Sequence, residues 1–377
     1  MSICNGEYWP SCSNCEQWAP LVKISINDSN GIYGNNGSIV RGTFAMDGQA
    51  VACGTDKGGV YIHSLETGKR VCSVERVGIN ASELGGRGGL NDIKSDLSGN
   101  LLAACFSPGI IRIYDLRIGV GCRSNSNTLV NLENTHKGAC TCISLPSDWL
   151  YQPIYSGGYD GYIRGWDLRK DGYISQVLSH ETPVVSLEKS NDERVITSTS
   201  FDGNIRIWRS SNLKLLKTLS GPQGSSCVLH STFSFNDKYL LCTGDSSSCI
   251  WKFGEEKISK ADINWMVSEQ TDMGHKTDYT DIKNKDYKVP FFTGFSTIWR
   301  DQVFVPRLNS SATAIGDAFV YCLHTAEYLY SLAPASSPSS ITTSIFKHPD
   351  LHNDLIVTTS SLPESSIILW KTNNAND

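Results

Sequence analysis

The chain lacks the two features that mark membrane-inserted or secreted proteins. No stretch approaches the roughly 18 consecutive apolar residues of a membrane-spanning helix. The first residues, MSICNGEYWPSCSNCEQW, lack the order of basic and then apolar residues that defines a signal peptide. We therefore expect no membrane partner, and a protein that works in the cytoplasm or the nucleus.

The chain also lacks an excess of positive charge. Its 33 Lys and Arg residues stand against 38 Asp and Glu, which gives a net charge of −5 at pH 7. Direct nucleic-acid binding relies on strongly basic surfaces, so we expect no direct contact with nucleic acid. Hydrophobic residues make up 40% of the chain and charged residues 19%, a composition typical of a folded domain and too apolar for disorder.

Cysteine is abundant, but the spacing of a metal site is incomplete. Most of the 13 cysteines lie in apolar runs such as VACGT, LLAACF and LLCTG, where a reduced cysteine acts as a small buried hydrophobe. This usage favours free thiols in a reducing compartment. Cys12 and Cys15 have CxxC spacing, with Cys4 upstream, but no second CxxC or HxxxH supplies the remaining ligands of a zinc site. We predict neither metal nor cofactor, and the role of these three cysteines stays open.

An internal repeat runs through most of the chain. A glycine followed five residues later by an aromatic residue occurs as GIIRIY ending at Tyr114, GYIRGW ending at Trp166 and GNIRIW ending at Trp208. Weaker copies end at His63, Trp251 and Trp370. The first five of these anchor residues are separated by 51, 52, 42 and 43 residues. A period of about 40–45 residues is typical of the four-stranded blades of a propeller.

Three copies of the repeat resemble the WD-repeat family. The resemblance is carried by IYDLR at 113–117, GWDLR at 165–169 and IRIW at 205–208, and the repeat covers nearly the whole chain. The family implies an all-β fold, a β-propeller built from four-stranded antiparallel blades.

The number of blades follows from the longest interval. Trp251 and Trp370 are 119 residues apart, which is too long for one blade. A divergent blade fits between them with Leu323 as its anchor, because Asp317 precedes it by the same six residues that separate aspartate and tryptophan elsewhere. We therefore predict seven blades, with the extra residues near 255–290 forming a loop insertion.

The two ends of the chain are expected to meet in one blade. The sequence ends seven residues after Trp370, before a fourth strand of the last blade can form, while the alternating segment APLVKISI at 19–26 precedes the first complete blade. We predict that this N-terminal strand completes the last blade, so that no long sheet edge stays unpaired. Residues 1–18 are then an N-terminal extension, and residues 19–377 form a single propeller domain.

The family resemblance also implies a buried hydrogen-bonded network of His, Ser or Thr, Asp and Trp in the best-preserved blades. A Ser–His–Asp set also suggests a hydrolase, but its recurrence in consecutive blades favours a structural framework, so we predict no catalytic residue. The remaining blades keep little of the network and should depend more on apolar packing. The predicted networks are His136, Ser156, Asp160 and Trp166 in one blade, and His180, Ser198, Asp202 and Trp208 in the next.

Two neighbouring repeats end in an aromatic residue followed by Asp-x-Arg. These are Asp115 with Arg117, and Asp167 with Arg169. In some propellers a doubled motif of this kind docks a substrate receptor onto the adaptor of a cullin-RING ubiquitin ligase, and a planar guanidinium suits such paired hydrogen bonds. The other interpretation is that each arginine caps its own turn. We treat the four residues as candidate partner-binding residues.

Three hypotheses for function remain open. The first is a non-catalytic protein-interaction scaffold that presents peptide- or protein-binding surfaces within a multi-protein complex, because propeller loops vary on a rigid disc. The second is the ubiquitin-ligase substrate receptor. The third is an enzyme similar to the propeller that hydrolyses the methyl ester of diphthine, which the blade at 156–169 resembles. The following blade reads IWRSS at 207–211 and lacks the aspartate of that family's second motif.

Overall fold

The strands follow from short apolar runs whose pattern depends on their place in a blade. Central strands such as β5 (Ala50–Thr55) and β9 (Leu101–Phe106) are buried at every residue, because each of their faces packs against another blade. Outer strands such as β11 (Thr128–Leu132) alternate between partly buried and exposed residues. A continuous apolar run therefore predicts a central strand, and alternation predicts an outer one.

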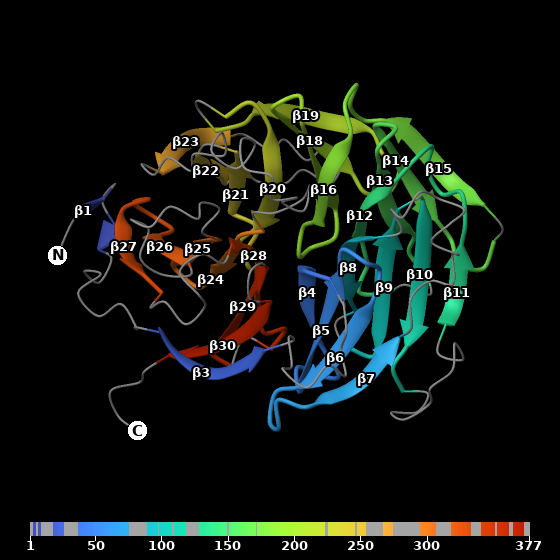
Figure 1. The fold of residues 1–377 in the computed structure, drawn as a ribbon. Helices are drawn as coiled ribbons and strands as arrows, with labels where there is room; N and C mark the ends of the chain where they lie inside the picture. Colours follow the sequence, from blue (N-terminus) through green and yellow to red (C-terminus); the bar gives the residue numbers. More distant parts are fainter. Residues whose placement is uncertain are drawn as a thin grey trace.

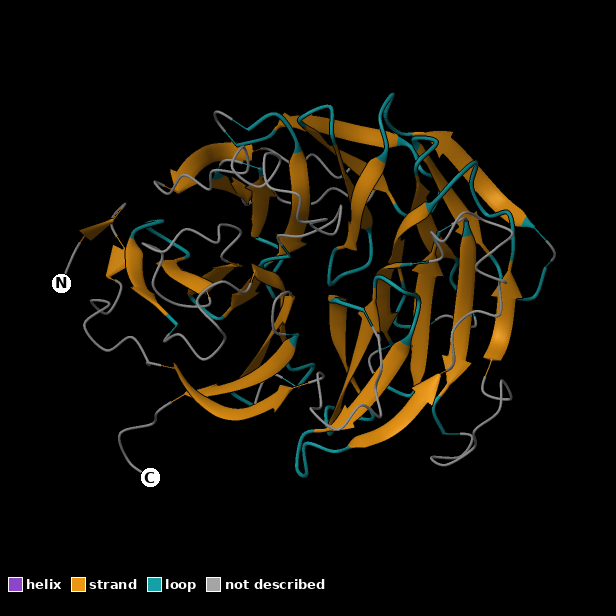
Figure 2. Cartoon of the chain, in the orientation of Figure 1, coloured by secondary structure: helices purple, strands orange, loops and turns teal. Residues whose placement is uncertain are grey.

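In the computed structural model, the chain forms a ring of seven four-stranded antiparallel sheets, which confirms the predicted propeller (Figure 1). Figure 2 shows that the described residues consist of strands, turns and loops. Within this described part, no helix is long and apolar enough to cross a membrane. The structure describes residues 3–4, 7–8, 18–25, 37–74, 89–96, 98–107, 109–117, 128–148, 151–170, 172–222, 225–245, 247–253, 267–273, 295–306, 318–332, 341–350, 353–361 and 365–372.

Each of the first six blades uses four consecutive strands, which follow chain order from the centre of the ring outward. Blades 1 to 3 are β4 (Ile39–Ala45), β5, β6 (Val60–Ser64) and β7 (Arg70–Val74); β8 (Leu90–Ser95), β9, β10 (Ile110–Asp115) and β11; and β12 (Cys140–Ser144), β13 (Ile154–Gly158), β14 (Tyr162–Trp166) and β15 (Tyr173–Leu178). Blades 4 to 6 are β16 (Val184–Lys189), β17 (Val195–Ser200), β18 (Asn204–Arg209) and β19 (Leu215–Ser220); β20 (Val228–Phe233), β21 (Tyr239–Gly244), β22 (Ser248–Phe253) and β23 (Val267–Met273); and β24 (Thr297–Trp299), β25 (Gln302–Pro306), β26 (Ala318–Cys322) and β27 (Tyr328–Ser331).

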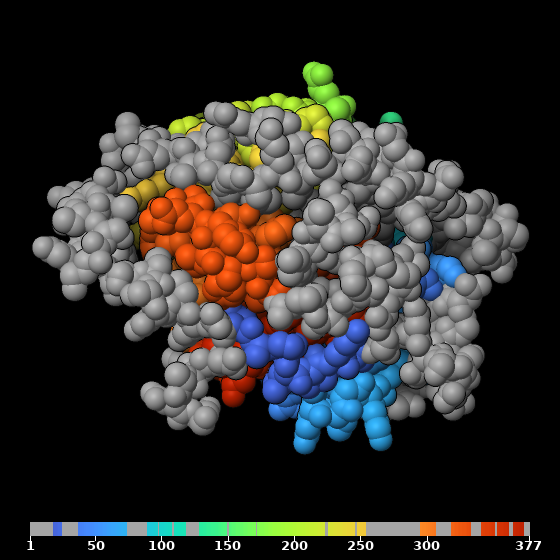
Figure 3. Space-filling view, turned by 60° about the vertical axis from the view of Figure 1, so that its left-hand side comes forward, coloured from blue at the N-terminus to red at the C-terminus, as the bar shows by residue number. Residues whose placement is uncertain are grey.

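Blade 7 combines strands from both ends of the chain, as predicted. It contains β28 (Ile341–Lys347), β29 (Leu355–Ser361), β30 (Ser366–Thr372) and, as its outer strand, β3 (Trp18–Ser25). β3 pairs antiparallel with β30 over its whole length, from Trp18 opposite Thr372 to Ser25 opposite Ser366. In the space-filling view, the blue residues of β3 lie between the orange residues of blade 6 and the lighter blue residues of blade 1 (Figure 3). Separately, β1 (Ile3–Cys4) and β2 (Glu7–Tyr8) form a short two-stranded ladder.

The divergent sixth blade exists, but its anchor differs from the expected one. Tyr321 pairs with Val303 in the way that Trp166 pairs with Ile154, and in both blades the register with the outer strand shifts just before the aromatic residue. The anchor of blade 6 is therefore Tyr321, two residues before Leu323. The expected anchor Leu323 was placed by its distance from Asp317, a residue outside the described ones. That spacing passes over Tyr321, the aromatic residue that occupies the anchor position.

Part of the segment predicted as a loop insertion supplies a strand. Residues 267–273, within the predicted insertion at 255–290, form β23 and pair with β22 as the outer strand of blade 5. The sequence VSEQTDM has few apolar residues, as outer strands need little apolar surface, so its strand character was not apparent. The rest of that segment lies outside the described residues.

The hydrophobic core lies between neighbouring blades. One cluster joins Ala52 and Ile62 of blade 1 to Leu102 and Phe106 of blade 2, all of them buried. Another joins blades 6 and 7 and includes large aromatic side chains such as Trp370. Because each blade buries its faces against two neighbours, the apolar packing is continuous around the ring.

A pair of variants in β3 tests how much the closing strand contributes. Ile24 is 6% exposed and packs with Ile367 and Leu369 of β30, whereas Leu21 on the same strand is 57% exposed. We expect Ile24→Ala to lower the free energy of unfolding by about 2–4 kcal/mol, because it leaves a cavity in the core. Leu21→Ala should change it by less than about 0.5 kcal/mol. Denaturant unfolding measures both, and equal effects would contradict the closing role of β3.

Candidate functional site

The two faces of the ring carry different turns. On one face, which we call the Asp-Gly face, the second and third strands of blades 3 and 4 are joined by turns that contain Gly161 and Gly203. These glycines have φ values of 76° and 75°, in the left-handed region that glycine adopts without strain. A side chain at Gly161 would also collide with the carbonyl oxygen of His180 in the next blade.

We call the opposite face the Asp-Arg face. Since strand direction alternates, the turns after the first strands and the turns after the third strands lie on this same side. Arg117 and Arg169 follow the third strands of blades 2 and 3 and therefore lie on it. The candidate residues are thus divided between a network within the blades and a surface formed by turns.

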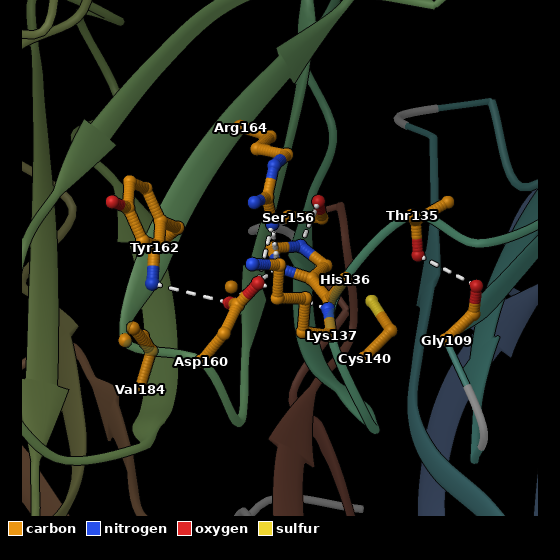
Figure 4. A network of polar contacts seen from close by, with 12 residues as sticks. Gly109, Thr135, His136, Lys137, Cys140, Ser156, Asp160, Tyr162, Arg164 and Val184 are labelled. Carbon is orange, nitrogen blue, oxygen red and sulfur yellow. Dashed lines mark hydrogen bonds and ion pairs between the residues drawn. The ribbon is translucent and has the colours of Figure 1, made fainter.

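The blade 3 network is formed by four side chains that the sequence predicted to meet, and Figure 4 labels three of them, His136, Ser156 and Asp160. The indole Nε1 of Trp166 donates a hydrogen bond of 2.8 Å to Ser156 Oγ. Ser156 Oγ lies 2.7 Å from Nε2 of His136, and Nδ1 of His136 lies 2.9 Å from Oδ1 of Asp160. With the imidazole proton on Nδ1, Ser156 and His136 each accept one hydrogen bond and donate another, so the bonds run from the tryptophan to the carboxylate.

An arginine that the sequence reasoning missed completes this network. Arg164 Nη1 donates to Oδ2 of Asp160 over 2.8 Å and lies 2.6 Å from Nδ1 of His136. The backbone N–H of Lys137 donates to the same carboxylate oxygen over 3.0 Å. A signal was present, because an arginine two residues before the anchor recurs in the next blade as Arg206.

Blade 4 repeats the arrangement. Trp208 Nε1 donates to Ser198 Oγ over 2.9 Å, and Ser198 Oγ lies 2.8 Å from Nε2 of His180. Nδ1 of His180 lies 2.9 Å from Oδ2 of Asp202, to which Arg206 Nη1 donates over 2.7 Å. Two consecutive blades therefore contain the same five-residue arrangement.

Other blades keep fragments of the network. In blade 7, Trp370 Nε1 donates to Thr358 Oγ1 over 2.9 Å, so its indole is satisfied as in blades 3 and 4. In blade 5, Cys242 occupies the strand position that corresponds to Ser156. Within the described part of the chain, the buried Nε1 of Trp251 makes no hydrogen bond. A weak thiol acceptor has replaced a hydroxyl there.

The Ser–His–Asp geometry does not expose a nucleophile. Ser156 and Ser198 are both 0% exposed, and the hydroxyl of Ser156 is engaged by Trp166 and His136. A nucleophilic hydroxyl must reach the reacting carbon of a substrate. The arrangement can stiffen a blade, since a satisfied buried network holds its strands in one register.

The electrostatic state of the network is a neutral imidazole beside an ionised carboxylate. Burial lowers the pKa of His136 and of His180, although the neighbouring aspartates oppose the shift. Burial alone would raise the pKa of Asp160, but hydrogen bonds from His136, from Lys137 N–H and from Arg164 outweigh it, so this pKa is lowered. The positive partner of Asp160 at neutral pH is therefore Arg164.

On the Asp-Arg face, each arginine is paired with the aspartate of its own motif. Arg117 donates from Nε to Asp115 Oδ1 over 3.0 Å and from Nη2 to Oδ2 over 2.6 Å. Arg169 makes the equivalent bonds to Asp167, each of 2.9 Å. The hydrogen bond from Arg169 lowers the pKa of Asp167 to about 2. Each arginine therefore caps its own turn, and no described contact joins the two pairs.

These arginines nevertheless remain on the surface. The side chains of Arg117 and Arg169 are 64% and 58% exposed, and each keeps three N–H donors beyond those used by its aspartate. The turns after the first strands of blades 3 and 5 add Tyr151, which is 75% exposed, and Phe235, which is 61% exposed. Exposed arginine and tyrosine are the side chains that most often dominate protein interfaces.

No metal site is apparent in the described ranges, where no group of three or more His, Cys, Asp or Glu is placed to hold an ion. Cys12 and Cys15 lie outside these ranges, and of Cys4 only the backbone is described. The described cysteines are free thiols, mostly buried in strands, and burial raises the pKa of the Cys53 thiol to about 12. They fill apolar space as the sequence predicted.

Comparison with known proteins supports this description. The family model "WD domain, G-beta repeat" matches residues 127–167, 172–209 and 213–252, which extend from β11 to β22. Autophagy-related protein 16 of Arabidopsis thaliana is 24% identical over 64% of this chain and 43% of its own length. A DDB1- and CUL4-associated factor 11 homolog of Caenorhabditis elegans is 25% identical over 51% of this chain and 33% of its own length.

A shorter match concerns an enzyme. Human diphthine methyltransferase is 35% identical over 68 residues, which are 18% of this chain and 15% of that protein. In each of these three comparisons, the matched region spans less than half of the relative's length.

Removing the central hydroxyl of a network tests its contribution to stability. Ser156→Ala leaves the indole N–H of Trp166 and the imidazole of His136 without their buried partner, so we expect a loss of about 1–3 kcal/mol in the free energy of unfolding. Ser175→Ala is the matched control, because Ser175 lies in β15 of the same blade and takes no part in these contacts. Denaturant unfolding of the two variants should differ by at least about 1 kcal/mol; similar midpoints would rule out a stabilising network.

The buried histidines His136 and His180 predict that the folded chain loses stability as the pH falls. Their pKa values are lower in the folded chain than in the unfolded one, so the unfolded chain binds more protons once the pH falls below the ordinary histidine value. Stability should be fully present at pH 7.5 and fall steadily towards pH 5. Unfolding midpoints measured across this range should fall less steeply for His136→Gln/His180→Gln than for the unaltered chain. The idea fails if both slopes are the same.

Proposed function

We propose that this chain, a seven-bladed WD-repeat β-propeller, is a non-catalytic scaffold that binds a protein or peptide partner through its Asp-Arg face. The observation that carries the proposal is the pair of exposed guanidinium groups of Arg117 and Arg169 on adjacent blades of one face. Their aspartates hold both side chains in place, so that little conformational freedom is lost on binding. Free thiols suit the reducing environment of the cytoplasm or nucleus.

The turns that form this face are fixed to one another across blade boundaries. The backbone N–H of Met46 in blade 1 donates to the carbonyl of Gly99 in blade 2 over 2.7 Å. The N–H of Asn191 in blade 4 donates to Oδ1 of Asp237 in blade 5 over 2.9 Å. Such bonds make the face a pre-organised platform, and binding sites are typically found in loops that a rigid scaffold positions.

The substrate-receptor hypothesis is the second candidate, and two observations favour it. The doubled Asp-x-Arg motif lies on neighbouring blades, with its arginines exposed. The chain is also similar to a DDB1- and CUL4-associated factor 11 homolog, whose name states an association with two other proteins. In this version, the partner of the Asp-Arg face is the adaptor of a cullin-RING ligase.

The hydrolase hypothesis has weaker support. It rests on a 68-residue similarity to human diphthine methyltransferase and on the blade at 156–169. The serine of that blade is enclosed by Trp166 and His136. Incubation of the purified chain with a diphthine methyl ester substrate tests this version, and turnover would replace the scaffold proposal.

A double substitution tests the Asp-Arg face. We expect Arg117→Ala/Arg169→Ala to reduce partner recovery in affinity purification from native cells by about tenfold or more, as for hot-spot residues. The control Lys57→Ala/Lys137→Ala removes two positive charges from the Asp-Gly face, and it should recover partners normally. Recovery of a cullin-RING adaptor would select the second candidate.

Both double variants must keep the unfolding midpoint of the unaltered chain, because all four side chains are surface groups. A folded Arg117→Ala/Arg169→Ala variant that recovers the same partners would exclude this face as the binding surface.

A further inference from the structure

The centre of the ring contains a cavity lined by charged side chains. Its volume is about 160 Å³, and the innermost strands of six blades, or the residues next to those strands, form its wall. Figure 1 shows these strands gathered around the middle of the ring. The ionisable residues that line the cavity are Arg41, Asp92, Lys94, Glu188, His230 and Lys347.

One pair of charges in the cavity wall is buried and fixed. Arg41 is 2% exposed, its Nε lies 3.6 Å from Oδ1 of Asp92, and its guanidinium carbon lies 2.9 Å from the ring centre of Phe295. The carboxylate of Asp92 also accepts hydrogen bonds from the backbone N–H of Ile93 and of Ile143, at 2.9 and 3.1 Å. This pair is part of the scaffold of the cavity.

A second pair joins blades 2 and 4. Nζ of Lys94 donates to Oε2 of Glu188 over 2.9 Å, and about a quarter of each side chain is exposed. The two pairs account for both acidic groups that line the cavity. Any further positive group there therefore lacks an acidic counterpart of its own.

Lys347 is that further group. Among the described residues it makes no ion pair, and burial lowers its pKa against the weaker attraction of Glu188 and Asp237. Glu188 is already bound to Lys94, and Asp237 accepts hydrogen bonds from the backbone N–H groups of Asn191 and Asp192. The cavity wall thus holds three cationic side chains and two anionic ones.

Histidine does not add to this surplus. Burial, and then the positive charges of Lys94 and Arg41, hold the pKa of His230 well below its usual value, so the imidazole is neutral. Nδ1 of His230 lies 3.4 Å from Ser296 Oγ, and its ring lies 4.2 Å from that of Phe295. Counted by side chains, the cavity wall therefore holds one more cationic group than it has acidic groups.

The surplus charge lies towards the Asp-Arg face. Lys94, Glu188 and Lys347 are each the last or second-to-last residue of a first strand. First strands end on the Asp-Arg face, the side that carries Arg117 and Arg169. A partner lying on that face would therefore cover the Lys347 end of the cavity.

We propose that this end of the cavity binds one carboxylate group, supplied by an acidic side chain of the partner that docks on the Asp-Arg face. One negative charge matches the single surplus cation, whereas a doubly charged phosphate would leave an unmatched charge in a partly desolvated site. The volume equals that of about five water molecules, which accommodates a carboxylate and a short aliphatic stem. The choice of a partner side chain as the source rests on the proposed function.

Titration calorimetry on the purified chain tests the inference with two probes at constant ionic strength. The probes are the capped peptide acetyl-Gly-Glu-Gly-amide and the free monocarboxylate butyrate, with inorganic phosphate as a third arm. We expect the peptide to bind, and Lys347→Gln to weaken its binding at least about tenfold, since a charge-assisted contact is lost. The control Lys371→Gln removes an exposed lysine of β30 in the same blade and should bind like the unaltered chain.

The possible results distinguish the carboxylate site itself, the source of the carboxylate and the surplus charge. Equal peptide affinity in Lys347→Gln, or tighter binding of phosphate than of either carboxylate, would overturn the carboxylate site. Butyrate binding without peptide binding would overturn the partner side chain as its source. The unfolding midpoint of Lys347→Gln without ligand should be equal to or above that of the unaltered chain, because an unmatched and partly buried charge is removed. A lower midpoint would contradict the surplus charge.

These measurements need no partner protein. Loss of partner recovery in Arg117→Ala/Arg169→Ala supports the docking face whatever the cavity binds. Conversely, peptide binding that depends on Lys347 supports the cavity site even if those arginines prove dispensable.

Discussion

The pairing of β3 with β30 is the constraint on which the rest of the molecule depends. Seven sheets can pack face to face around a centre only if the last sheet meets the first, and here two distant segments of the chain share one sheet. The indole of Trp18 in β3 also donates to the side chain of Gln302 in blade 6. Closure fixes the positions of the inner strands, and with them the cavity and the two faces.

Polar groups serve two separate purposes in this ring. In blades 3 and 4 they are buried or partly buried and hydrogen-bonded to one another, so they add rigidity to the blades. On the Asp-Arg face, the carboxylates are used to orient guanidinium groups that remain exposed. An arginine paired with an aspartate is therefore structural beside His136, where the pair is part of the network. After a third strand, the same kind of pair leaves its arginine available for contacts.

The repeating features were predictable from sequence, and the features that arise between repeats were not. The anchors Tyr114, Trp166 and Trp208, the closing strand and the blade count all follow from a period that local residues preserve. Arg164 was not predicted although Arg206 repeats it, because an arginine in a strand is equally compatible with a solvent-facing position. The tyrosine anchor of blade 6 and strand β23 were missed because a degenerate blade keeps its backbone pairing after losing its signature.

The central cavity shows a different limit. Arg41 and Asp92, or Lys94 and Glu188, belong to different blades, so no local pattern connects them. Only the closed ring brings the first strands together. The sequence of one blade indicates the residues that stabilise that blade. The charge balance across blades depends instead on how the closed ring places the first strands next to one another.

The direction of the closing strand has a mechanical consequence. β3 enters antiparallel to β30, with Trp18 opposite Thr372, so the chain enters and leaves blade 7 at the same end of the strand pair. A pulling force on the flanking segments would load the backbone hydrogen bonds one after another, as in opening a zipper, instead of shearing them all at once. The closed ring therefore has one seam, between β3 and β30, that tension on the two flanking segments would open from one end.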